Sequence, residues 1–148
     1  MSTARRGSAI QRFSGREVYL GGNPVKASAA IGQFNLVGVR NDGGVEDYDP
    51  AAVTADGTYA YVAAGVATSD IAGGATDGAV ETDKDVVMGG IFLFNTNADI
   101  DGDDVGALVY GEDSDTVKAA AVADGIVVGR LMEYNGDNTG YVLVEQYS

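Results

Sequence analysis

The chain of 148 residues contains no cysteine, no histidine and no tryptophan, and it has only two prolines. Without cysteine and histidine it cannot form a disulfide, a thiolate or imidazole metal site, a Cys–His dyad or a Ser–His–Asp triad. These absences exclude most of the familiar hydrolytic chemistry. They leave the redox compartment open, because a protein without cysteine is equally suited to reducing and oxidising surroundings.

Long apolar runs are also missing. No stretch approaches the roughly 18 consecutive apolar residues that cross a bilayer, and the N-terminal residues lack the apolar core of a secretory signal. The formal net charge is −13, and this charge opposes binding to nucleic acid or to an anionic membrane. We therefore expect a soluble, unexported protein with neither nucleic acid nor membrane as a partner.

The charge is divided unevenly along the chain. Residues 1–40 contain six basic residues and one acidic residue, whereas residues 41–148 contain three basic and 21 acidic residues. Residues 1–16 are rich in Arg, Ser, Gly and Ala and show no sustained hydrophobic period. We expect a flexible basic N-terminal arm at 1–16 that meets an acidic or polar partner, followed by one acidic domain at 17–148.

Glycine is abundant, with 22 residues, and it recurs beside residues that tolerate tight turns. Six such pairs supply a glycine for a positive φ angle: Asp42-Gly43, Asp56-Gly57, Asp77-Gly78, Asp101-Gly102, Asp124-Gly125 and Asn135-Gly136. Short β-prone runs separate these turns. The pattern predicts an all-β fold, a small antiparallel β-barrel or a sandwich.

The β-prone runs predict eight strands, at 17–20, 31–40, 58–67, 85–94, 105–110, 116–120, 126–134 and 140–146. The last two should form an antiparallel hairpin around the loop 135–139. Tyr59 and Tyr61 alternate with small residues and are expected to pack in the core. Residues 115–124 also contain good helix formers behind a possible Asp115 cap, so a short helix is an alternative there. Residues 67–83 offer little apolar surface and are expected to form a mobile loop.

One acidic segment resembles a calcium-binding loop. Oxygen donors at alternate positions, Asn97, Asp99, Asp101 and Asp103, surround a glycine at the sixth position. The twelfth position is Leu108, where a bidentate glutamate is required, so the segment does not complete an EF-hand. An irregular Ca²⁺ site is one interpretation, and an acidic solvated loop is the simpler one. We expect no other cofactor.

The remaining patterns do not support catalysis. Carboxylate pairs could serve glycoside hydrolysis, but 22 acidic residues produce such pairs by chance, and no base accompanies a serine or threonine nucleophile. The phosphate-binding motif GxxxxGK[ST] is absent. We therefore expect a protein that is not an enzyme.

The C-terminal half resembles a known family. The matching runs are Val86-Val87-Met88-Gly89-Gly90-Ile91 with its neighbours 85 and 92, then residues 104–110, 126–131 and 140–144. In order they resemble the strands of tailed-phage capsid decoration proteins, also described as head-stabilising or cement proteins. Where that family commonly has Gly-Asp before its Leu-Tyr or Val-Tyr, this chain has Gly106-Ala107, so that turn is expected to differ.

The resemblance implies a structural virion protein of a bacteriophage with a small β-barrel or β-tulip domain. It implies a place on the outer surface of the capsid, synthesis in the host cytoplasm, the major capsid protein as partner, and a homotrimer. Within this interpretation the arm would bind the capsid through arginines and two apolar anchors, namely Arg5, Arg6, Ile10, Arg12, Phe13 and Arg16. The alternative is an extracellular or surface-layer calcium-dependent adhesion module that uses the acidic loop.

Overall fold

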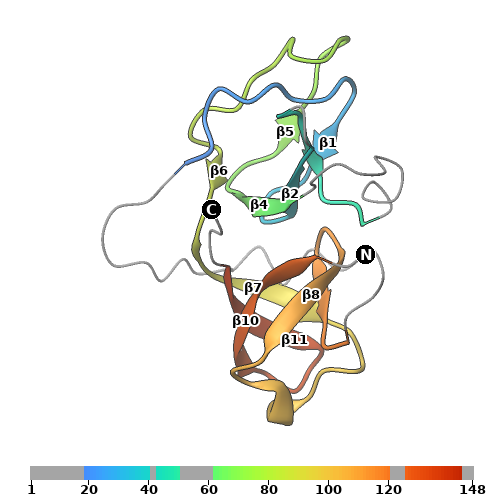
Figure 1. The fold of residues 1–148 in the computed structure, drawn as a ribbon, viewed down its shortest axis with the longest axis vertical. Coiled ribbons are helices and arrows are strands. Elements are labelled where there is room, and N and C mark those ends of the chain that lie inside the picture. Colours follow the sequence, from blue (N-terminus) through green and yellow to red (C-terminus); the bar gives the residue numbers. More distant parts are fainter. Residues whose placement is uncertain (1–18, 41–42, 51–61, 121–125, 145–148) are drawn as a thin grey trace.

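The computed structural model describes residues 19–40, 43–50, 62–120 and 126–144. The protein is nearly all β, as the sequence predicts. A four-stranded sheet and a two-stranded ribbon come from the N-terminal half, and a closed barrel comes from the C-terminal half (Figure 1). Within the described residues the only helical element is the short 3-10 helix η2 (Gly102–Asp104).

The barrel has five strands: β7 (Gly90–Thr96), β8 (Leu108–Asp113), β9 (Thr116–Lys118), β10 (Val127–Tyr134) and β11 (Thr139–Val144). They follow one another around the barrel in the order β10, β11, β7, β9 and β8, and β8 pairs again with β10. Four of these pairings are antiparallel, and β7 with β9 is parallel. The parallel pairing arises because β8 turns tightly into β9, which then runs in the same direction as β7.

The N-terminal half forms a second, open sheet. Its strands are β3 (Val45–Asp47), β2 (Leu36–Val39), β4 (Val62–Ala67) and β6 (Val86–Val87), hydrogen-bonded in that order and all antiparallel. A separate antiparallel ribbon joins β1 (Ala30–Ile31) to β5 (Ile71–Ala72). Figure 1 places this sheet and ribbon at the opposite end of the molecule from η2.

One hydrophobic core joins the sheet to the barrel. Leu36, Tyr48, Val66 and Val87 of the N-terminal half are buried in one cluster with barrel residues such as Phe94. The cluster continues through the barrel with Phe92, Ile100, Val109, Val117, Val128, Leu131, Val142 and Val144. A smaller cluster fills the other side of the sheet and contains Val25, Ile31, Val37, Val45, Ala67, Ile71 and Val86. Because the first cluster contains residues of both parts, the sheet and the barrel each need the other to bury their apolar side chains.

Tyr48 marks the junction between the two halves. Its hydroxyl donates to the carbonyl of Gly111 over 3.2 Å and accepts the N–H of Ile126 over 3.3 Å. The backbone N–H of Leu36 donates to the carbonyl of Ser114 over 2.7 Å. A Cβ added to Gly111 would lie 2.6 Å from the Tyr48 ring, so the ring packs directly on the glycine backbone.

The C-terminal hairpin is confirmed. β10 and β11 pair antiparallel, with Leu131 opposite Val142. Its loop contains Gly136 at φ 82° and Asn138 at φ 63°, conformations that glycine and asparagine tolerate. Gly43 and Gly78 also have positive φ angles, at 86° and 81°. The expectation fails at Gly102, which lies in η2 rather than in a positive-φ turn.

Several predicted strand bounds are wrong. The predicted strand 31–40 is broken, since Phe34 takes a positive φ of 67° between β1 and β2. The predicted strand 85–94 is interrupted at Met88 and Gly89, between β6 and β7, and β7 begins with Gly90 at φ 131°. Of the predicted strand 17–20, only residues 19 and 20 are described, and there Tyr19 forms an isolated bridge to Val87. Tyr59, Tyr61, Gly57 and Gly125 lie outside the described residues.

Residues 67–83 do not form one loop poor in contacts. They include the last residue of β4 and all of β5, and Ile71 is buried beside Ile31. The carbonyl of Val80 accepts the N–H of Val25 over 2.8 Å. In residues 115–124 the described part forms β9, so the strand prediction is confirmed over Thr116–Lys118.

Candidate functional site

The segment that resembles a calcium loop uses its oxygen atoms to order its own backbone. Asp101 accepts the N–H of Asp103 over 2.9 Å, and the N–H of Asp101 donates to Asp104 over 2.9 Å. This reciprocal pair is a capping box at the start of η2. Asn97 accepts the N–H of Asp99 over 3.0 Å, and its amide donates to Glu112.

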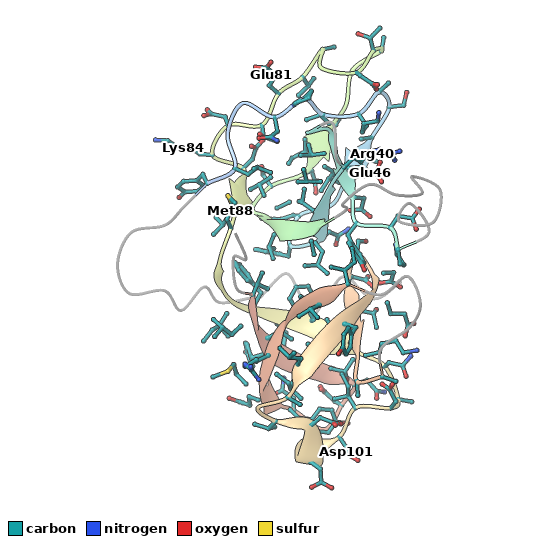
Figure 2. All side chains as sticks on the ribbon, in the orientation of Figure 1. Arg40, Glu46, Glu81, Lys84, Met88 and Asp101 are labelled. Atoms are coloured by element: carbon teal, nitrogen blue, oxygen red, sulfur yellow. The ribbon has the colours of Figure 1, made fainter. Side chains whose placement is uncertain are left out.

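Asp99 has a different role from its neighbours. Its two carboxylate oxygens accept the N–H groups of Ala119 and Ala120, over 3.0 and 3.1 Å. The carboxylate therefore fastens the loop to the chain that leaves β9. Asp103 is exposed, and Figure 2 shows Asp101 pointing away from the end of the barrel. Across the described ranges, no three acidic side chains are grouped as ligands of one ion.

The predicted capsid-binding residues cannot be located. Arg5, Arg6, Ile10, Arg12, Phe13 and Arg16 all lie outside the described residues. In the described residues, two basic side chains form ion pairs. Lys26 pairs with Asp77 over 3.1 Å, and Arg40 pairs with Glu46 over 3.3 Å (Figure 2 labels the second pair).

A pocket of about 470 Å³ opens where the β1–β5 ribbon meets the ends of β2 and β3. Ile31 and Ile71 give it apolar walls, and Asp47 and Asp70 contribute carboxylates. The other lining residues are Ala30, Gly32, Asn35 and Ala72. We call this space the ribbon pocket. It combines apolar walls with negative charge, which suits a ligand that has an apolar body and a cationic end.

Asn35 is the least satisfied group of the ribbon pocket. It is only 5% exposed, and its amide nitrogen donates to Asp47 over 3.0 Å and to Ser114 over 3.3 Å. The amide oxygen is buried and has no hydrogen-bond partner. An unpaired buried acceptor costs free energy of roughly 1–3 kcal/mol, so a donor placed there would be stabilising.

Two carboxyl groups approach each other in the turn from β8 to β9. Asp113 accepts the N–H of Asp115 over 2.9 Å, and Asp115 is buried. Burial and the neighbouring Asp115 carboxyl raise the pKa of Asp113 to about 6. Burial, and to a smaller extent the negative charges of Asp49 and Asp113, also raises the pKa of Tyr48. Asp113 therefore gains and loses its proton in mildly acidic solution, in a turn at the junction of sheet and barrel.

The ribbon pocket was not predicted from the sequence. Asn35, Asp47 and Asp70 are far apart in the chain, and none belongs to a motif with recognisable spacing. They meet because β2 pairs with β3 while β5 returns to β1.

Comparisons with protein families, curated proteins and solved structures find no match to this chain. Among the described residues, no helix is both long and apolar enough to cross a membrane.

Proposed function

We propose that the protein is a structural component of a bacteriophage particle, a decoration or cement protein that binds the outer surface of the head and stabilises it. The observation that carries this proposal is the division of charge. Residues 1–16 contain four arginines and no acidic residue, and the remainder contains five basic and 22 acidic residues. A basic segment attached to a body of charge −17 suits a protein that attaches by one end and faces water with the other.

The described body supports this division. Two of its cations, Lys26 and Arg40, are paired with acidic side chains, and Arg130 donates to the carbonyl of Gly106 over 3.0 Å. The arm therefore supplies most of the chain's remaining positive charge. Guanidinium groups form strong charge-assisted hydrogen bonds with carboxylates and carbonyls, which the major capsid protein would provide.

The affinity for the capsid would increase when several arms of one oligomer bind together. Each arm would lose conformational entropy on docking. The arginine hydrogen bonds and the apolar anchors Ile10 and Phe13 would offset this cost in free energy. In a closed homotrimer three arms lie within reach of one capsid site, and modest single affinities then combine. The protein would act without catalysis and without a cofactor. It would be made in the host cytoplasm.

The decisive experiment compares capsid binding by three proteins at matched salt. Deleting residues 1–16 should leave the circular dichroism of the β-domain unchanged and weaken binding to mature capsids at least tenfold. Replacing Arg5, Arg6, Arg12 and Arg16 by alanine should weaken binding less, because Ile10 and Phe13 remain. A truncated protein that decorates capsids as well as the full chain would refute the role of the arm.

The oligomeric state is a separate prediction. We expect sedimentation equilibrium at micromolar concentration to give a homotrimer, with a mass three times the 15.1 kDa of one chain. A species of one chain at all concentrations would contradict the trimer.

Nothing in the described part of the chain favours the alternative of a calcium-dependent adhesion module. Asp99 and Asp101 already accept backbone N–H groups, and such carboxylates would have to exchange these bonds for an ion.

A further inference from the structure

We propose that the ribbon pocket is a receptor for an arginine side chain, and that in the free protein the occupant is an arginine from the chain's own N-terminal residues 1–16. This inference concerns the protein before it meets any partner. It does not rest on the proposed function, and it would hold for a protein with another role.

The shape and composition of the pocket select the ligand. Its volume of about 470 Å³ is far larger than a single ion needs, and Ile31 and Ile71 form apolar walls. An arginine side chain matches this combination, because its methylene stem can lie along apolar surface while the guanidinium contacts acids. A small anion or an acidic peptide would be repelled by Asp47 and Asp70.

The hydrogen-bonding groups of the pocket point to a donor with several N–H groups. Asp47 and Asp70 form no ion pair within the described part of the chain. The Asp47 carboxylate accepts a hydrogen bond from Asn35, and the Asp70 carboxylate accepts one from Gln33. Each carboxylate therefore retains acceptor capacity. The amide oxygen of Asn35, a lining residue, also has no partner, but it is buried and meets a ligand only when the side chain turns toward the pocket. Guanidinium carries five N–H donors in a planar fork, so one group can serve several of these acceptors.

The charge distribution selects the source. Residues 1–16 contain four of the chain's six arginines and no acidic residue that could neutralise them. The other two, Arg40 and Arg130, are already bonded to Glu46 and to Gly106. The pocket belongs to a body of opposite charge, which draws the basic segment toward it.

The length of the segment permits docking within one chain. The described chain begins at Tyr19, which bridges to Val87 of β6. Arg5 lies 14 residues before Tyr19, and an extended chain spans about 3.3–3.6 Å per residue, so this arginine can reach about 45–50 Å. A tethered ligand acts at an effective concentration near millimolar, which makes a modest intrinsic affinity sufficient.

Paramagnetic relaxation tests the proposal on the full-length protein. The chain has no cysteine, so Ser8→Cys creates a single attachment point for a spin label between Arg6 and Arg12. We expect the label to broaden the methyl signals of Ile31 and Ile71 several-fold more than that of Ile100, which lies beside η2 at the other end of the molecule (Figure 1). Equal broadening of all three signals would overturn the proposal.

Variants then test the chemistry of the pocket. The double variant Asp47→Asn with Asp70→Asn keeps the shape and removes the charge, and it should abolish the selective broadening. Glu81→Gln with Glu133→Gln removes the same charge at two exposed positions outside the pocket, and it should leave the broadening intact. Selective broadening that survives the pocket variant, or that is lost equally in the control, would overturn the proposal.

A mixed sample identifies the source of the arginine. Spin-labelled protein without isotopes is combined with isotope-labelled protein that carries no label. Docking within one chain predicts no selective broadening of Ile31 and Ile71 in this mixture. Broadening there would assign the occupant to a second copy and would refute the assignment to the chain's own segment. Replacing the four arginines at 5, 6, 12 and 16 by alanine should abolish the selective effect in every sample.

Discussion

At the scale of single residues, Asp113 is a described group whose charge changes in mildly acidic solution. The pKa of Asp113 is raised from 3.8 to about 6, mainly because burial disfavours its charge and then because Asp115 stands beside it. The folded protein therefore binds a proton at Asp113 more readily than the unfolded chain does. This contribution to stability is complete below pH 3.8 and is lost as the pH rises through about 6.

Asp113→Asn should therefore stabilise the protein at neutral pH. The new amide can still accept the N–H of Asp115, and it carries no charge. Since Asp113 is partly exposed, screening reduces the gain to about 1 kcal/mol in the free energy of unfolding. Urea unfolding at pH 7.5 and at pH 3.5 measures the change, which should be present at the first pH and absent at the second. Asp103→Asn, at an exposed position, is the control and should alter neither value. A destabilised Asp113→Asn protein at pH 7.5 would contradict this account.

At the scale of elements, the acidic loop between β7 and β8 is hydrogen-bonded to the segment that follows β9. Asp99 holds the N–H groups of Ala119 and Ala120, and these bonds join two segments 20 residues apart. Asp99→Ala should lower the free energy of unfolding by about 1–2 kcal/mol, because hydrogen bonds to a charged acceptor are lost at a partly solvated site. Thermal denaturation measures this loss of stability. Asp103→Ala, which loses no such hydrogen bond, serves as the control.

The same experiment tests the calcium interpretation. Adding millimolar Ca²⁺ should not raise the melting temperature of the wild-type protein, since the carboxylates are engaged with the backbone. A rise that Asp99→Ala removes would show that the loop does bind the ion.

The elements also show where prediction from the sequence succeeds. The hairpin of β10 and β11 could be predicted because a long β-prone run, an Asn-Gly turn and a second run are contiguous. β3 and β5 could not, because strands of three and two residues have no measurable period. The positive φ of Phe34 and the break between β6 and β7 before Gly90 follow from tertiary packing, which local propensity does not contain. The same limit applies to the ribbon pocket, whose acceptors meet only after the strands pair.

At the scale of the whole molecule, the sheet and the barrel should unfold as one unit. They share the core cluster that contains Leu36 and Phe94, and Tyr48 packs on Gly111 across the junction. Gly111→Ala should destabilise the protein by about 1–3 kcal/mol, because the new methyl group would lie 2.6 Å from the Tyr48 ring and the ring must shift.

Amide signals from β2 and β10, followed through urea denaturation, measure both effects. The two sets should give one midpoint in the wild type and one lower midpoint in Gly111→Ala. Gly102→Ala is the matched control, because an added Cβ meets no atom within 4 Å there. Separate midpoints for sheet and barrel would show that the shared core does not couple them.

The parallel closure of the barrel has a consequence for synthesis on the ribosome. β7 cannot complete its hydrogen bonds until β9, twenty residues later, has been made, and the barrel cannot close until β11 follows. Until then Leu36, Tyr48, Val66 and Val87 have no barrel residues to pack against. The N-terminal half therefore emerges with its apolar face uncovered and short strand edges unpaired, a state in which chains associate with one another. The N-terminal half has little charge of its own to oppose this association, because residues 1–89 hold seven basic and 11 acidic residues, whereas residues 90–148 hold two basic and 11 acidic residues. The negative charge that keeps chains apart therefore accumulates only as the barrel strands are made.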